Sequence, residues 1–144
     1  MREILFRGKR IDNGEWVEGA FLNDRDGAFY ICPAVSDITY GDNGNRRRIG
    51  CWYRVAPTTV GQYTGLTDKN GKRIFEGDVV RYTERKINGS DVPCVHPVEY
   101  AEGGWYVDVW FLNNWLYDGA NGNTRLEDIE VIGTIHDNPE LLEA

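Results

Sequence analysis

Cys94 and His96 are the side chains with the most direct chemistry, and they stand two positions apart in a segment whose apolar alternation predicts a β-strand. Successive strand residues point to opposite faces, so these two share one face. A thiolate beside an imidazole acts as a nucleophile where a cleft and an orienting acid are also present. No motif indicates such a cleft or such an acid, and a half-buried thiol beside a surface histidine is the simpler interpretation. We assign the pair no catalytic role.

The other residue types that do chemistry lack the necessary spacing. His136, the second histidine, precedes Asp137, but no CxxC or HExxH pattern completes a metal site. Carboxylates are plentiful, yet no pair is fixed at the separation that glycoside hydrolysis requires. Neither a GxxxxGK[ST] loop nor a GxGxxG turn that would bind phosphate is present. The sequence therefore predicts no catalytic residue, no metal ligand and no cofactor.

The segment that begins at Asp68, with the order Asp-Lys-Asn-Gly-Lys, contains a fragment of a calcium-binding loop. If Asp68, Asn70 and Gly71 occupy positions three, five and six of an EF-hand loop, position one is Leu66 and position twelve is Gly77. Both essential carboxylates are then missing, which excludes calcium binding by this mechanism. The same segment favours a tight turn, because aspartate bonds its own backbone two residues on and glycine adopts positive φ.

Two groups of residues are candidates for binding a macromolecule. The arginine run at residues 46–48 is the only basic run, and it is followed by Trp52, whose ring could stack on a base. A net charge of −7 repels phosphate and disfavours nucleic acid as the partner. Trp110 and Trp115 belong to an aromatic run of the type that anchors protein interfaces, although core packing accounts for most of that run. The candidate interaction surface consists of Arg46, Arg47, Arg48, Trp52, Trp110 and Trp115.

The composition suits a protein of a reducing compartment. The 144 residues are enough for one domain, and 41% of them are hydrophobic. No stretch approaches the ~18 consecutive apolar residues of a membrane span, and the first seven residues are too short and too charged for a secretory signal. The three cysteines lie far apart and fit free thiols. We expect a cytoplasmic protein without a membrane partner.

The apolar pattern alternates with period two in short segments, which favours a mainly β fold. The 17 glycines point to many tight turns, and Asn13-Gly14 is the strongest hairpin signal. Residues 36–50 form the longest irregular stretch of the first half. Residues 105–112 form the strongest predicted strand, and its apolar second half predicts that both of its faces are covered.

Several single residues refine this expectation. Gly133 lies inside the last predicted strand and indicates a bulge. Pro97 implies an edge or bulged position, because proline cannot donate to a β-ladder. Asn138–Leu142 predicts one short C-terminal helix turn that begins with an N-cap and a proline. We place a boundary between an N-terminal β-rich part, residues 1–57, and a domain at residues 58–144, which could also form one compact unit.

Three patterns in the chain carry a family resemblance. They are GQYTGL, DKNGK and FEGDVV within residues 61–80, REI and FR within residues 2–7, and VIGTI and NPELL within residues 131–142. Together they resemble the YopX family of phage and prophage proteins over the whole chain. Residues 20–55 and 84–125 depart freely and add nothing to the resemblance.

The resemblance implies a protein of phages and prophages that works in the cytoplasm of the bacterial host, with an SH3-like barrel in its C-terminal part. The family has no established activity, so it transfers no catalytic residue, and its central motif is better explained as a fold signature than as a site. We expect a mainly β protein with a C-terminal SH3-like small barrel, an N-terminal β-rich part and a short C-terminal helix. The favoured function is a non-enzymatic binding module for a host or phage protein. The alternatives are a nucleic-acid-binding protein and an enzyme with an unrecognised site, and homo-oligomerisation is compatible with each of them.

Overall fold

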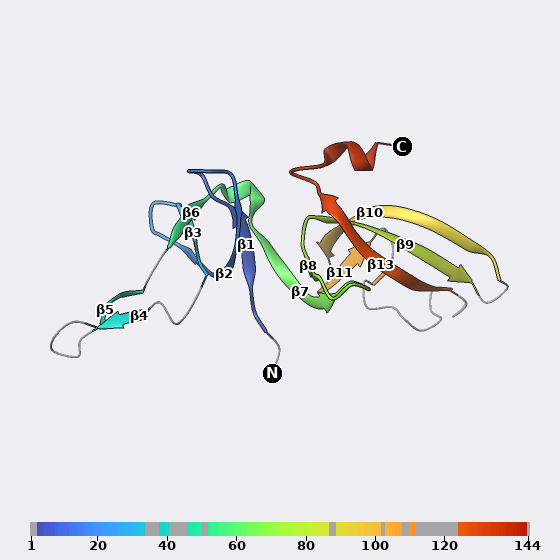
Figure 1. The fold of residues 1–144 in the computed structure, drawn as a ribbon, viewed down its shortest axis with the longest axis horizontal. Helices are drawn as coiled ribbons and strands as arrows, with labels where there is room; N and C mark the ends of the chain where they lie inside the picture. Colours follow the sequence, from blue (N-terminus) through green and yellow to red (C-terminus); the bar gives the residue numbers. More distant parts are fainter. Residues whose placement is uncertain are drawn as a thin grey trace. The chain divides into compact units, whose positions relative to one another are not determined.

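The computed structural model describes residues 3–33, 38–40, 46–49, 52–86, 89–101, 103–107, 110–111 and 124–143. The chain divides into two compact units, Met1–Tyr63 and Thr64–Ala144, which we call unit 1 and unit 2. Nearly every described element is a β-strand, which confirms the mainly β prediction (Figure 1). The predicted domain boundary after residue 57 stays a prediction. Within the described residues, no helix is long and apolar enough to cross a membrane.

Unit 1 is built from short antiparallel strands. They are β1 (Phe6–Lys9), β2 (Trp16–Asn23), β3 (Phe29–Cys32), β4 (Ile38–Tyr40), β5 (Arg46–Ile49) and β6 (Tyr53–Val55), followed by the 3₁₀ turn η2 (Pro57–Thr59). Four strands lie in the order β6-β3-β2-β1, and β1 also pairs with Gly61 and Gln62 at the start of the next strand. β4 and β5 form a separate two-stranded sheet.

The predicted hairpin at Asn13-Gly14 is confirmed, because β1 and β2 pair in antiparallel register on either side of it. Gly14 has a φ of +72°, and the Asn13 side chain accepts a hydrogen bond from the Glu15 N–H at 2.9 Å. Glycine carries no Cβ to oppose this conformation, and the asparagine amide satisfies a backbone donor of the turn. Two adjacent residues, Asn13 and Gly14, therefore fix the first reversal of the chain.

Most of the apolar packing of unit 1 lies on one face of its sheet. Ile31 and Val55 are fully buried there. The rings of Phe6, Phe21 and Phe29 follow one another with centroids 5.2 and 5.1 Å apart. The strand register places all five side chains on the same face, so the period-two pattern of β1, β2, β3 and β6 is what builds this core.

β6 also bonds back to the residues that follow β1. The Ile11 N–H donates to the Arg54 carbonyl at 3.0 Å, and the Ala56 N–H donates to the Lys9 carbonyl at 2.9 Å. These bonds draw the two ends of the four-stranded sheet together. Gly8 lies where they meet, and a Cβ on it would come within 2.9 Å of the Val55 side chain.

Unit 2 contains the longer strands. They are β7 (Gly61–Thr67), which begins in unit 1, β8 (Arg73–Phe75), β9 (Asp78–Lys86), β10 (Asp91–Ala101), β11 (Gly104–Val107), β12 (Trp110–Phe111) and β13 (Thr124–Thr134), followed by the 3₁₀ turn η3 (Pro139–Leu142). Five of them form an antiparallel sheet in the order β12-β11-β10-β9-β13. This sheet is open in the described residues, so the SH3-like barrel stays a prediction.

The alternation along β9 explains the core of unit 2. Val80 and Tyr82 are buried on one face, whereas Arg81 and Arg85 lie on the other. The cluster on the buried face consists of Ile74, Val80, Tyr82, Val98, Val107 and Leu126. Burying such side chains contributes about 1.5–3 kcal/mol each, which makes this cluster the main apolar stabilisation of the unit.

Two single-residue predictions are confirmed. The register of β13 against β9 shifts between Val131 and Gly133, as expected for a bulge at that glycine. Pro97 pairs with Val79 of β9, and within the described residues β11 pairs with β10 only from Val98 onward. Pro97 therefore lies on an edge, where its missing N–H breaks no ladder.

Two predictions about strands were wrong. The stretch at residues 36–50, predicted to be irregular, contains β4 and β5, which pair with each other. Backbone hydrogen bonds between strands form with polar and apolar residues alike. β4 and β5 lack the apolar alternation on which the strand prediction depended, so the pattern did not indicate them. The single strand predicted at residues 105–112 is instead β11 and β12, which run antiparallel. A run that is apolar on both faces gives no signal of the reversal inside it.

The predicted C-terminal helix turn is the 3₁₀ turn η3. Its preceding residue, Asn138, makes no side-chain cap. The Asn138 side-chain oxygen instead accepts the Thr134 N–H at 3.3 Å, which ties the turn to the end of β13. The residue types predicted a turn at this place correctly, but not an α-helix or its capping bond.

Candidate functional site

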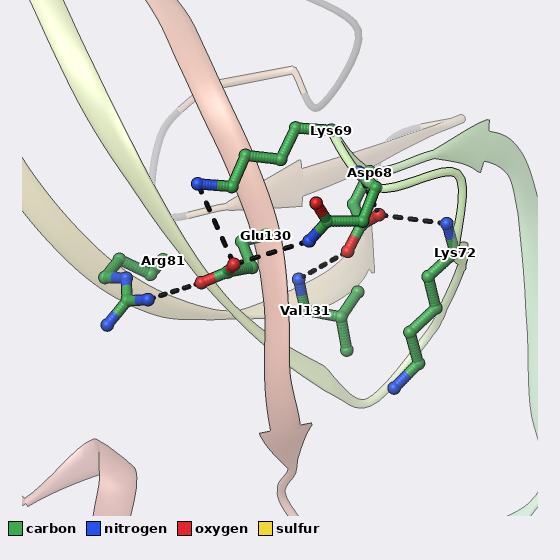
Figure 2. A network of polar contacts seen from close by, with 7 residues as sticks. Asp68, Lys69, Lys72, Arg81, Glu130 and Val131 are labelled. Carbon is green, nitrogen blue, oxygen red and sulfur yellow. Dashed lines mark hydrogen bonds and ion pairs between the residues drawn. The ribbon is translucent and has the colours of Figure 1, made fainter.

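The central sequence motif forms a turn that holds β13, and we call residues 68–72 the Asp68 hook. One side-chain oxygen of Asp68 accepts the N–H groups of Asn70 and Lys72, both at 2.9 Å. Its second oxygen accepts the Val131 N–H of β13, also at 2.9 Å (Figure 2). Asp68 is only 7% exposed, so a buried carboxylate joins a local turn to a strand 63 residues away in sequence.

The hook meets β13 at an irregularity. The register of β13 against β9 shifts between Glu127 and Glu130, and Asp128 has a φ of +56°. A bulge leaves backbone groups outside the regular ladder, and such groups need other partners. The Lys69 N–H donates to the Ile129 carbonyl at 2.8 Å, beside the bond from Asp68. The hook therefore supplies the partners that the bulge removes.

The charge state of Asp68 follows from these bonds. Burial raises the pKa of its carboxyl, because the charged form loses hydration. Hydrogen bonds from the N–H groups of Val131, Lys72 and Asn70 lower that pKa by more, so that it lies below its ordinary value. Asp68 is consequently an anion at neutral pH, with both oxygens engaged by the chain's own backbone.

A second carboxylate lies next to the hook on the exposed side of β13. Glu130 pairs with Arg81 of β9, and its other oxygen lies 3.7 Å from the Lys69 ammonium group and 3.4 Å from the Asn70 amide nitrogen (Figure 2). The hydrogen bond from Arg81 is the main reason that the pKa of Glu130 lies below its ordinary value. This pair is partly open to water, so it contributes less than the buried carboxylate.

The chemistry of the hook is structural. Its carboxylate is filled by three backbone donors, and its neighbour Glu130 is held by cations of the same chain. Within the described residues, no group of three His, Cys, Asp or Glu side chains could hold a metal ion. The most patterned stretch of the sequence thus has a specific role in positioning β13.

The Cys94 and His96 side chains lie on one face of β10, as predicted. They pair in register with Tyr82 and Val80, which belong to the core. A hydrogen bond of 2.9 Å joins the buried Tyr82 hydroxyl to His96 Nδ1. The Cys94 thiol donates to the Val92 carbonyl at 3.6 Å. Pairing of the imidazole with a core tyrosine gives His96 a packing role, because a buried hydroxyl needs a partner.

The predicted interaction residues belong to different elements, and the surface that they were expected to form stays a prediction. Arg46, Arg47 and Arg48 form most of β5 in unit 1, where the backbone but not the side chains are described. Trp52 is half-buried just before β6, also in unit 1. Trp110 belongs to β12 in unit 2, with its side chain outside the described part, and Trp115 lies outside the described residues altogether. The six residues therefore fall into two groups on different units.

Sequence reasoning missed the exposed apolar side chains of β10. Val92, Val95 and Tyr100 are 42%, 36% and 55% exposed. The Tyr100 ring packs edge-on against Trp105 of β11, with centroids 4.8 Å apart. A signal for this pair was present, because Tyr100 and Trp105 flank a Gly-Gly turn and become cross-strand partners once β10 and β11 form a hairpin.

Among the described strands, β10 has no second partner before Val98, and this edge is unsuited to adding another strand. The Gly77 N–H donates to the Val98 carbonyl at 3.0 Å, so the even-numbered residues of β10 turn their backbone groups toward β9. Odd-numbered residues, including Pro93, Val95 and Pro97, then face the opposite edge. Two of these lack an N–H, and prolines at an edge disfavour strand addition. A partner at β10 would therefore bind through side chains.

The protein is mainly β and consists of two units of antiparallel strands. In unit 2 the Asp68 hook binds the bulged strand β13. The family model described as YopX protein matches residues 5–143, so the chain belongs to the YopX family. This confirms the resemblance that the three sequence patterns carried.

This chain is similar to one curated protein and to one solved structure. The chain is 37% identical over 73 residues to the SPbeta prophage-derived uncharacterized protein YopX of Bacillus subtilis (strain 168). That match covers 51% of this chain and spans about half, 52%, of the relative. The crystal structure of protein EF1440 from Enterococcus faecalis is similar with a TM-score of 0.59 and 28% identity, covering 99% of this chain and 100% of that one.

Proposed function

We propose that this protein is a non-enzymatic binding module that acts on a host or phage protein in the cytoplasm of a bacterial cell. The observation that carries the proposal is the exposure of apolar side chains on both faces of β10, with Val92 and Tyr100 on one face and Val95 on the other. Apolar and aromatic side chains that a rigid sheet holds in water are the types that anchor protein interfaces. The prophage origin in the name of the Bacillus subtilis relative supports the phage setting.

The proposal includes a fold for the binding unit. Unit 2 is a variant of the SH3-like barrel that the family resemblance implies, and its five-stranded antiparallel sheet supports this assignment. Small barrels of that type bind partners through loops and strand surfaces. This is an analogy of fold, and the exposed side chains of β10 indicate which surface would bind.

Affinity capture tests the proposal. The tagged full-length protein is incubated with lysate of phage-infected and uninfected host cells, with and without nuclease. We expect one protein to be retained at a fixed stoichiometry after nuclease treatment. Val92→Ser and Val95→Ser are made separately, because these residues lie on opposite faces of β10. The substitution on the face that binds should weaken retention, because it removes an exposed apolar anchor.

A matched control separates binding from folding. Leu22 is 47% exposed in unit 1, so Leu22→Ser changes exposed apolar surface outside the proposed interface. Retention should be unchanged in this variant. Retention that disappears with nuclease would replace the proposal with nucleic-acid binding, and then the arginines of β5 become the residues to substitute. Retention of nothing, from either lysate, would reject a binding role.

A further inference from the structure

We propose that the Tyr100–Trp105 pair at the β10–β11 hairpin is a binding site for an arginine side chain of the protein partner. This inference rests on the proposed function and specifies the chemistry of the partner. Tyr100 is 55% exposed, and its ring lies against Trp105, which packs against the unit 2 core. The pair is thus a rigid aromatic surface that faces water on one side.

Aromatic rings in unit 1 show what covers such a surface in this chain. The Arg7 guanidinium lies 4.5 Å from the Trp16 ring centroid, and that of Arg10 lies 4.0 Å from the centroid of Tyr53. A guanidinium over an aromatic face is attracted by the negative potential of the ring. Among the described residues, no cation lies over Tyr100 or Trp105. Within the part of the chain that the structure describes, no arginine fills at this pair the position that Arg7 and Arg10 fill in unit 1.

Charge complementarity identifies the occupant as cationic. Residues 1–63 contain 9 basic and 8 acidic side chains, a net charge of +1, whereas residues 64–144 contain 7 basic and 15 acidic ones, a net charge of −8. The excess of acid therefore belongs to unit 2. A negative surface attracts a basic partner and repels phosphate at long range.

Part of this acidic surface is formed by the turn η3 and the residue after it. η3 packs against β10, and it carries exposed Glu140, with exposed Glu143 directly after it. Gly133 of β13, whose Cβ would meet η3, pairs through Val79 of β9 with Pro97 of β10. Gly133, Val79 and Pro97 share one face of the sheet, so the acidic turn lies on that face, opposite the face that carries Val98 and Tyr100. These carboxylates add to the negative charge of unit 2 and do not lie next to an arginine on the pair.

The direct test is an NMR titration of the full-length protein with a blocked Gly-Arg-Gly-Arg-Gly peptide. The same peptide with citrulline in place of arginine keeps the shape and removes the charge. We expect the arginine peptide to shift the Trp105 indole and Tyr100 amide signals, and the citrulline peptide to leave them in place. Tyr100→Leu keeps apolar bulk without a π-face and should weaken binding about three- to fivefold. Tyr100→Phe keeps the ring and should bind like the wild type.

Several outcomes would overturn the inference. They are equal shifts by both peptides, shifts confined to other residues, and equal binding by the Leu and Phe variants. A thymidine oligonucleotide that shifts the same signals more strongly than the peptide would also overturn it, in favour of stacking by nucleic-acid bases.

Affinity capture separates this inference from the proposed function. If Tyr100→Leu retains the partner protein as well as the wild type does, the arginine site is overturned and the proposed binding function stands. Failure to retain any protein, together with peptide binding that depends on Tyr100, would reject the proposed function and support the site.

Discussion

In unit 1, two strands approach closely at a glycine, because this residue has no side chain. In unit 2, a buried carboxylate accepts hydrogen bonds from backbone N–H groups, one of them on the bulged strand β13. Gly19 of β2 lies against β3 so closely that a Cβ would be 1.9 Å from the Cys32 carbonyl oxygen. Asp68 instead adds atoms, and both of its oxygens accept backbone N–H groups. Unit 1 thus depends on the missing side chain of Gly19, and unit 2 depends on the charge of Asp68. Different substitutions should therefore destabilise the two units.

The units also differ in how they use charge. In unit 1 arginines cover the rings of Trp16 and Tyr53, and acidic and basic residues nearly balance. In unit 2 the cations of β9 pair with carboxylates, as Arg81 does with Glu130, and acid remains in excess. The net charge of the whole chain, −7, thus averages two different surfaces.

The largest effect is expected from Gly19→Ala. Its methyl group would overlap the Cys32 carbonyl, and overpacking against backbone destabilises by about 3 kcal/mol or more. Urea unfolding followed by NMR should show loss of unit 1 signals, with unit 2 protected. Gly14→Ala is the control, because nothing lies within 4 Å of its Cβ and only the φ of +72° costs about 1 kcal/mol. Equal effects of the two substitutions would contradict the steric explanation.

Asp68→Asn should have the next largest effect, and it should act on unit 2. An amide replaces one carboxylate oxygen with an NH₂ group, which cannot accept a backbone N–H. Leaving one buried donor unpaired costs about 1–3 kcal/mol. Urea unfolding of unit 2 measures the change, and exposed Asp128, which tolerates asparagine at its φ of +56°, provides Asp128→Asn as the control. If the two variants unfold alike, the hook does not stabilise β13.

Acid should weaken unit 2 through the same carboxylate. Folding lowers the pKa of Asp68 below its ordinary value of 3.8, so the stability it contributes is present above that value and is lost as pH falls through the lower folded pKa. In unfolding measured from neutral pH to about pH 2, the stability of the wild type should approach that of Asp68→Asn as the pH falls below about 4. A gap between them that persists at the lowest pH would show that the charge is not the cause.

Glu130→Gln should have the smallest effect. The side chain is partly exposed and pairs with Arg81 and Lys69 on the outer face of the sheet. We expect a slight loss of unit 2 stability that is smaller than for Asp68→Asn and that shrinks further at about 0.5 M salt, because salt screens exposed pairs. Paired unfolding curves at low and high salt provide the measurement. A loss that is the same at both salt concentrations would point to packing instead of charge.

The sequence predicted well where a local rule acts. Asn13-Gly14 gave a hairpin, Gly133 a bulge and Pro97 an edge, because each depends on the φ angle or the missing donor of one residue. The prediction that Cys94 and His96 share a face was also correct, since strand geometry alone decides it. It could not reveal that Tyr82 bonds the histidine, because that pairing depends on the register of two strands.

The candidate interaction surface stays a prediction. The aromatic run around Trp110 drew attention, whereas the Tyr100–Trp105 pair did not, because its two rings become neighbours only when the Gly-Gly turn forms a hairpin. The arginine run was assigned to a loop or a surface, and the structure places it on strand β5. Exposure is a property of packing, and no pattern of residue types states which face of β10 remains in water.

The sequence by itself determined the mainly β class, the turns and the family, because these follow from alternation, from glycine and proline, and from long motifs. Only the tertiary structure decided what the central motif does. The residues from Asp68 to Lys72 predict a tight turn, and that turn forms. The second oxygen of Asp68 finds its donor on β13, and a contact across 63 residues is set by how the strands pack and not by any local preference.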